Sequence, residues 1–121
     1  MKKILIVEDD QFLVNAYQEK FSKIKDVKLN IALDGNQGLL SIEKDKPDAI
    51  ILDLALPNLD GFQLLRILKN EQIEIPMIVA SNLGSKKDIK QALSLGVEIY
   101  YIKSDTSIKE IVDKAIEIIK K

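Results

Sequence analysis

The chain has 121 residues, of which 46% are apolar and 31% are charged, a balance typical of one globular domain. Its 18 basic and 19 acidic side chains nearly cancel, so the composition lacks the basic excess that nucleic-acid binding requires. It has no cysteine and no histidine, which excludes disulfides, thiolate chemistry, the usual zinc sites, histidine general bases and a phosphohistidine of its own.

Short apolar runs alternate with longer stretches at helical spacing. In chain order we predict strands over Ile4–Val7, Val27–Leu33, Ala49–Leu52, Met77–Ala80 and Ile99–Ile102. The first, third and fourth runs are apolar without alternation, which is typical of strands buried on both faces of a parallel sheet. The second run alternates, which indicates that one of its faces is less covered.

Helices are predicted between the strands and after the last one. Their apolar stripes are Phe12, Leu13, Ala16, Phe21 and Ile24 in the first, Leu39, Leu40 and Ile42 in the second, Leu64, Leu65 and Leu68 in the third, and Ile108, Ile111, Val112, Ala115, Ile118 and Ile119 in the last. Gly96 is expected to end a fourth helix in the left-handed conformation. Helix N-caps are predicted at Asp10, Asp34, Asp60 and Ser107, the last three with capping-box spacing.

Five successive βα units predict an α/β fold with a doubly wound, parallel five-stranded sheet. The expected strand order is 2-1-3-4-5, the flavodoxin-like arrangement, with right-handed crossovers. We found no repeat, linker or low-complexity segment, so residues 1–121 are interpreted as one domain. No apolar stretch is long enough for a signal peptide core or a membrane span, and a cytoplasmic protein is expected.

Side chains that can bind a metal ion or an anion follow the four central predicted strands. They are Glu8 and Asp9, Asp53, Ser81, and Lys103. Because parallel strands end at one edge of the sheet, these side chains are expected to meet in one crevice. Three carboxylates and one ammonium leave a formal charge of −2, which a divalent cation would cancel, and Mg²⁺ suits an open crevice of oxygen ligands.

Together these residues resemble the response-regulator receiver domain of two-component signalling. The most specific part is residues 47–61, PDAIILDLALPNLDG, which matches the acceptor segment of that family without a gap. Residues 4–10 resemble its acid-pair segment, and residues 96–103 resemble its last strand. The resemblance extends over nearly the whole chain.

This resemblance implies a role for each site residue. Asp53 would be the phosphoacceptor; Asp9, Asp53 and the backbone carbonyl of Ala55 would hold Mg²⁺, with Glu8 acting through water; Ser81 and Lys103 would contact phosphoryl oxygens; and Tyr100 would be the aromatic residue that turns inward on activation. The surface around Glu98 and Ile99 lacks the charged pattern of one common dimer class of the family, and the sequence departs from the family pattern at two positions of the site. Asn82 replaces a small residue after the switch hydroxyl, and Ser104 replaces the proline, often cis, that usually follows the lysine.

The expected function is Mg²⁺-dependent phosphoryl transfer to Asp53, which would switch the surface of the fourth helix, fifth strand and fifth helix. The donor would be a sensor histidine kinase or a phosphotransfer protein, and the output would be a downstream effector domain or protein. Direct binding to nucleic acid or membrane is not expected, nor is an enzymatic role, whereas a phosphorylation-dependent homodimer is compatible with the family.

Two alternatives remain open from the sequence. One is a pseudo-receiver that is not phosphorylated and acts only as a protein-interaction module. The other is an Mg²⁺-dependent phosphatase using Asp53 as a transient nucleophile, although such sites generally need a second acid where this chain has Ala55. The cognate kinase, the output and any further domain of a longer regulator also stay open.

Overall fold

The computed structural model describes residues 1–120; Lys121, the last residue of the predicted domain, lies outside the described residues. The elements in chain order are β1 (Lys2–Val7), α1 (Gln11–Ser22), β2 (Val27–Ala32), α2 (Gly35–Lys44), β3 (Ala49–Leu52), α3 (Gly61–Asn70), β4 (Met77–Ser81), α4 (Lys86–Ser94), β5 (Ile99–Ile102), a short 3₁₀ turn η1 (Lys103–Asp105) and α5 (Ile108–Ile119).

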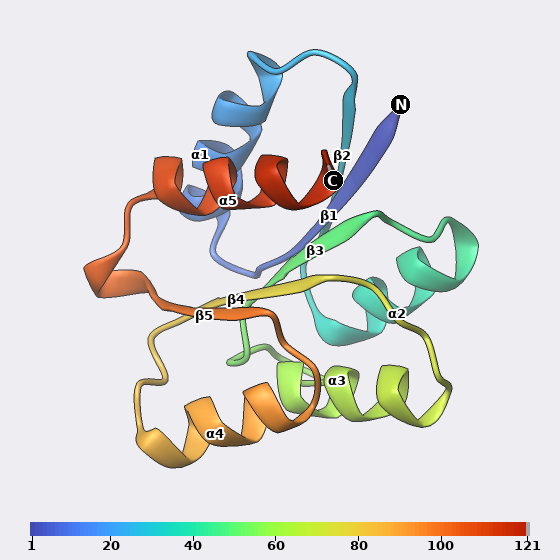
Figure 1. Ribbon diagram of the computed structural model, residues 1–121, viewed down its shortest axis with the longest axis vertical. Helices are drawn as coiled ribbons and strands as arrows, with labels where there is room; N and C mark the ends of the chain where they lie inside the picture. Colours follow the sequence, from blue (N-terminus) through green and yellow to red (C-terminus); the bar gives the residue numbers. More distant parts are fainter. Residues whose placement is uncertain (121) are drawn as a thin grey trace.

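The five strands form one parallel sheet in the order β2-β1-β3-β4-β5, as the sequence predicted. Helices α1 and α5 cover one face, and α2, α3 and α4 cover the other (Figure 1). Successive side chains of a strand point to opposite faces. Leu5 and Val7 of β1 therefore pack towards α2 and α3, whereas Ile4 and Ile6 pack towards α1 and α5.

The central strands are buried along their apolar runs. All four residues of β3 and all five of β4 are buried, whereas most of the edge strand β2 is half-buried. This confirms the distinction drawn from the alternating second run. Asp53 follows directly on β3, the buried middle strand of the sheet.

The predicted apolar stripe of the first helix was partly wrong, although Leu13, Phe21 and Ile24 do pack against the core. Phe12 is 81% exposed at the start of α1, and Ile24 lies beyond the end of the helix. The buried face consists of Val14, Tyr17 and Phe21, which follow the spacing i, i+3, i+7. Strand boundaries also differ by one or two residues: β1 begins at Lys2, β2 ends at Ala32 and β4 includes Ser81.

The helix-capping predictions were largely confirmed. The side chains of Asp10, Asp34, Asp60 and Ser107 each accept a hydrogen bond from a backbone N–H in the first turn of the following helix. A complete capping box is present at Asp60, whereas the Gln37 side chain accepts from the N–H of Leu33 instead of that of Asp34. Gly96 follows α4 with φ +96°, the left-handed conformation expected there.

Candidate functional site

Parallel pairing aligns the ends of four adjacent strands, β1, β3, β4 and the edge strand β5. Val7 pairs with Leu52, Leu52 with Val79, and Val79 with Tyr100. The chain therefore leaves the sheet at nearly the same level after β1, β3, β4 and β5. This register brings four of the predicted site residues to one edge: Glu8 after β1, Asp53 after β3, Ser81 at the end of β4 and Lys103 after β5.

The three predicted acidic residues form a cluster. One carboxylate oxygen from each of Glu8, Asp9 and Asp53 lies within 4.8 Å of the other two. Glu8 and Asp53 are buried, at 3% and 7% exposure, whereas Asp9 is exposed to solvent. The cluster is thus embedded in the sheet edge on one side and open to solvent on the other.

Lys103 joins the two buried acids. Its Nζ lies 2.7 Å from Glu8 Oε1 and 3.0 Å from Asp53 Oδ2. Burial raises the pKa of Glu8, and the charge of Asp53 raises it further, while Lys103 opposes both effects. Burial would lower the pKa of Lys103, but its hydrogen bonds to Glu8 and Asp53 outweigh burial and raise it.

The donor set fits a hard divalent cation. The cluster offers carboxylate oxygens from the ends of two strands, β1 and β3, and the single lysine leaves a formal charge of −2. The other Asp53 oxygen, Oδ1, accepts a hydrogen bond from the N–H of Ala55 at 3.3 Å, which fixes the first turn of the β3–α3 loop. Ala55 itself is exposed beside the cluster.

Ser81 and Tyr100 lie next to the acidic cluster and contact the β4–α4 loop. Ser81 is fully buried, and its Oγ accepts a hydrogen bond from the N–H of Leu83 at 3.2 Å. The hydroxyl of Tyr100 donates a hydrogen bond to the carbonyl of Leu83. Tyr100 packs on the face covered by α2, α3 and α4, and Tyr101 on the opposite face, as expected for neighbours in a strand.

Two contacts near the site were not anticipated from the sequence. The N–H of Ser104 donates to Asn82 Oδ1 at 3.2 Å, which joins the two residues that depart from the family pattern. Asp34, interpreted only as a helix cap, also accepts a hydrogen bond through Oδ2 from Asn58 Nδ2 at 3.0 Å. Both contacts link loops far apart in the sequence, so no local pattern could have indicated them. The Lys103–Ser104 peptide bond is trans.

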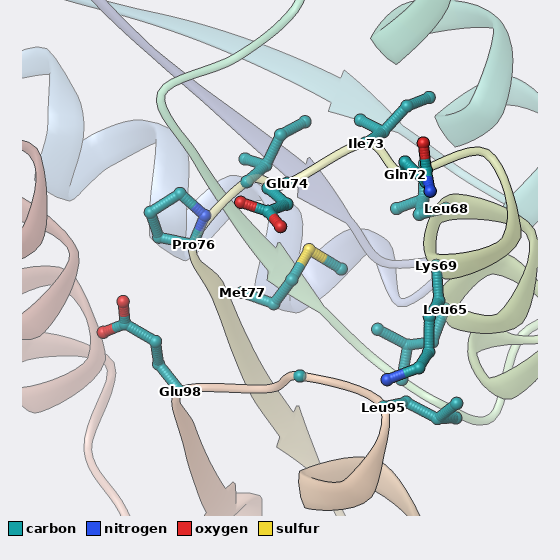
Figure 2. Close-up of a pocket in the computed structure, with 12 residues that line it drawn as sticks. Leu65, Leu68, Lys69, Gln72, Ile73, Glu74, Pro76, Met77, Leu95 and Glu98 are labelled. Carbon is teal, nitrogen blue, oxygen red and sulfur yellow. The ribbon is translucent and has the colours of Figure 1, made fainter.

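A cavity of about 760 Å³ lies at the other end of β4, away from the acidic cluster (Figure 2). Its apolar lining includes Leu65, Leu68 and Met77. Glu74 and Glu98 also line it, and the Glu98 carboxylate points away from Met77. None of the predicted site residues lines it. The predicted site is thus the shallow acidic edge of the sheet, not this cavity.

Comparison with known proteins places these features in context. The sequence profile of the response regulator receiver domain matches residues 4–116. The transcriptional regulatory protein CiaR of Streptococcus pneumoniae is 36% identical over 103 residues, which cover 85% of this chain and 45% of CiaR. The alkaline phosphatase synthesis regulator PhoP of Bacillus subtilis is 31% identical over 102 residues, which cover 84% of this chain and 42% of PhoP. The chain thus spans less than half the length of these relatives.

Solved structures show the same fold. The receiver domain of the Francisella response regulator 1452 is 30% identical and superposes with a TM-score of 0.90, over 99% of this chain and 98% of that domain. The Mn²⁺-bound form of response regulator Rcp1 is 27% identical, with a TM-score of 0.83 over 98% of this chain and 91% of the other.

Proposed function

Because this chain belongs to the response regulator receiver domain family, we propose that Asp53 accepts a phosphoryl group from a phosphohistidine of a sensor kinase or phosphotransfer protein. The observation that carries this proposal is the contact of one lysine, Lys103, with both buried acids of the strand edge. Such a lysine lies within reach of oxygens transferred to Asp53. The proposed Mg²⁺ ligands are Asp9, Asp53 and the carbonyl of Ala55, with Glu8 acting through water.

The proposed reaction is an in-line displacement at phosphorus. A carboxylate oxygen of Asp53 forms the new P–O bond, the P–N bond of the donor imidazole breaks, and the imidazole leaves with a proton. Lys103 stabilises the charge on the transferred oxygens, and Ser81 would orient one of them by a hydrogen bond. Bound Mg²⁺ would supply the remaining charge neutralisation.

The proposed switch begins at Ser81. In the unphosphorylated protein its Oγ accepts from the N–H of Leu83, so a hydrogen bond to a phosphoryl oxygen would pull the hydroxyl away from the β4–α4 loop. Tyr100 holds the same loop through the carbonyl of Leu83, and its ring would report the change. The resulting population shift would alter the surface of α4, β5 and α5.

The proposed partners follow from this scheme. They are a kinase or phosphotransfer protein as donor, and an effector domain or protein that reads the switched surface, with a phosphorylation-dependent homodimer as one form of output. We propose a cytoplasmic location and no direct contact with nucleic acid. None of the described helices is long and apolar enough to cross a membrane.

A titration with beryllofluoride, a phosphoryl analogue, tests the proposal against the pseudo-receiver. With Mg²⁺ present, beryllofluoride should shift the NMR signals of Asp53, Ser81 and Lys103, and it should have no effect when Mg²⁺ is omitted. Asp53→Asn should abolish the response. A protein that folds normally but shows no Mg²⁺-dependent response would be a pseudo-receiver. Turnover of an aryl phosphate would instead indicate the phosphatase alternative.

A further inference from the structure

A hydrogen bond connects the two loops that follow Ser81 and Lys103. The N–H of Ser104 donates to the side-chain Oδ1 of Asn82 at 3.2 Å, between residues 22 positions apart. Asn82 comes directly after Ser81, and Ser104 directly after Lys103. The contact therefore joins the chain next to the switch hydroxyl to the chain next to the site lysine.

This hydrogen bond supplies an acceptor for a backbone N–H that has none within its own turn. Residues Lys103–Asp105 form the 3₁₀ turn η1, and the first N–H groups of such a turn have no acceptor within it. Ile102, which precedes the turn, provides no side-chain cap. Asn82 supplies the acceptor from a different loop, so its side chain caps η1 from outside.

The position of this turn determines where the Lys103 side chain begins. Lys103 is the first residue of η1, and from there its side chain extends so that Nζ contacts both Glu8 Oε1 and Asp53 Oδ2. A backbone fixed at the start of the turn limits the positions available to the ammonium group. A frayed turn would let the lysine swing towards solvent, because its side chain is already 16% exposed.

Asn82 is itself held by its neighbours. The adjacent Ser81 is fully buried at the end of β4, and its Oγ accepts from the N–H of Leu83. The carbonyl of Leu83 accepts from the Tyr100 hydroxyl. Asn82 therefore lies between two residues, Ser81 and Leu83, that are held by burial and hydrogen bonds. These neighbours restrict the backbone of Asn82, although its side chain is exposed.

We propose that Asn82 is a positioning residue for Lys103, which it holds over Asp53 by capping the turn that Lys103 begins. The inference rests on the proposed phosphoryl transfer to Asp53. It also predicts a mechanical link: any displacement of Ser81 towards a phosphoryl group moves Asn82, and with it the turn η1 in the β5–α5 connection.

The test uses substitutions that separate the acceptor oxygen from the bulk of the side chain. Asn82→Leu keeps the branched shape and the number of heavy atoms but removes the acceptor, whereas Asn82→Asp keeps the acceptor. Ser104→Ala keeps the backbone N–H, and Asn70→Leu makes the same chemical change at an exposed site at the end of α3. Two quantities are measured: hydrogen exchange of the amide at position 104 by NMR, and the rate of phosphorylation by acetyl phosphate at saturating Mg²⁺.

Asn82→Leu should speed exchange of the amide at position 104 by roughly three- to tenfold, as expected for the loss of one hydrogen bond. Asn82→Asp and Ser104→Ala should retain its protection. The maximal phosphorylation rate of Asn82→Leu should fall by about three- to tenfold, with a smaller change in the half-saturating donor concentration, because the lysine acts on the transferred charge. Asn70→Leu should match the unmodified protein in both measurements.

Unchanged exchange at position 104 in Asn82→Leu would overturn the proposed cap. Faster exchange with an unchanged phosphorylation rate would overturn the positioning role. These failures differ from failure of the proposed function, in which the unmodified protein would not become phosphorylated on Asp53 although the amide at position 104 remained protected by Asn82.

Discussion

Replacing Lys103 by methionine tests the electrostatics of the site. Lys103→Met keeps a long side chain but leaves Glu8 and Asp53, 3% and 7% exposed, without their cation. Removing one partner of a fully buried ion pair costs about 3–5 kcal/mol. Here the lysine is 16% exposed and Glu8 can take up a proton, so we expect the free energy of unfolding to fall by about 2–3 kcal/mol near neutral pH without Mg²⁺.

Urea unfolding measures this cost. With a slope of about 1.5 kcal/mol per molar urea, the midpoint should fall by roughly 1.3–2 M. Lys109→Met is the matched control, because Lys109 Nζ lies only 2.6 Å from Asp113 Oδ2, but on an exposed helix face. That substitution should cost at most about 0.5 kcal/mol. Equal effects of the two substitutions would refute the argument that burial, and not distance, makes the Lys103 contacts important.

The stability lost in Lys103→Met should depend on pH. Burial already raises the folded-state pKa of Glu8 above its ordinary value of 4.5, and losing Lys103 removes a group that opposes this. Between the two pKa values the folded state binds a proton that the unfolded state does not. The stability deficit of Lys103→Met should therefore shrink as the pH falls towards 4.5 and grow as it rises. A deficit that widened on acidification would contradict this reasoning.

Three further predictions concern the loops around the site. The phosphorylated protein should decay slowly, because Leu83 cannot hydrogen-bond an attacking water, and Leu83→Glu should shorten its half-life; a half-life of seconds in the unmodified protein would contradict this. Gly61→Ala should destabilise the fold by about 2 kcal/mol or more, since a Cβ there would lie 2.6 Å from backbone of the β3–α3 loop. In the control Gly84→Ala the nearest atom would be a side-chain tip at 3.2 Å, with backbone no nearer than 3.9 Å, so equal urea midpoints of the two variants would be the contrary result. On phosphorylation the NMR signals of the Tyr100 ring should shift more than those of Tyr101, and the reverse order would exchange their roles.

Much of the fold was predictable because its signals are local. The runs before Asp53 and Ser81 are uninterrupted and apolar, so they indicate buried parallel strands and place the polar residues at their ends. The error in α1 has a physical reason. Apolar side chains occur around much of this helix, and two stripes of helical period were compatible with the sequence. Phe21 is buried with Val14 and Tyr17, which the predicted stripe lacked, while Phe12 in the first turn is exposed.

The site was predictable in its residue types and their meeting point, but not in its contacts. The strand order brings Glu8, Asp53 and Lys103 together, yet the sharing of one ammonium by two buried acids depends on side-chain geometry. The bond between Asn82 and Ser104 pairs a side chain with a backbone N–H across two irregular loops. Such a bond follows no periodic pattern. Taken singly, Asn82 and Ser104 are only substitutions of the residues that the family usually has there, and neither indicates the other as its partner.

The central claim is most directly tested by locating the phosphoryl group. The purified protein is incubated with acetyl phosphate and Mg²⁺, and the modified residue is identified by mass spectrometry. The account predicts a single phosphoryl group on Asp53 that is labile to hydroxylamine, as an acyl phosphate is, and that is absent when Mg²⁺ is omitted or in Asp53→Asn. An acid-stable phosphoryl group on Ser81, or undiminished labelling of Asp53→Asn, would contradict it.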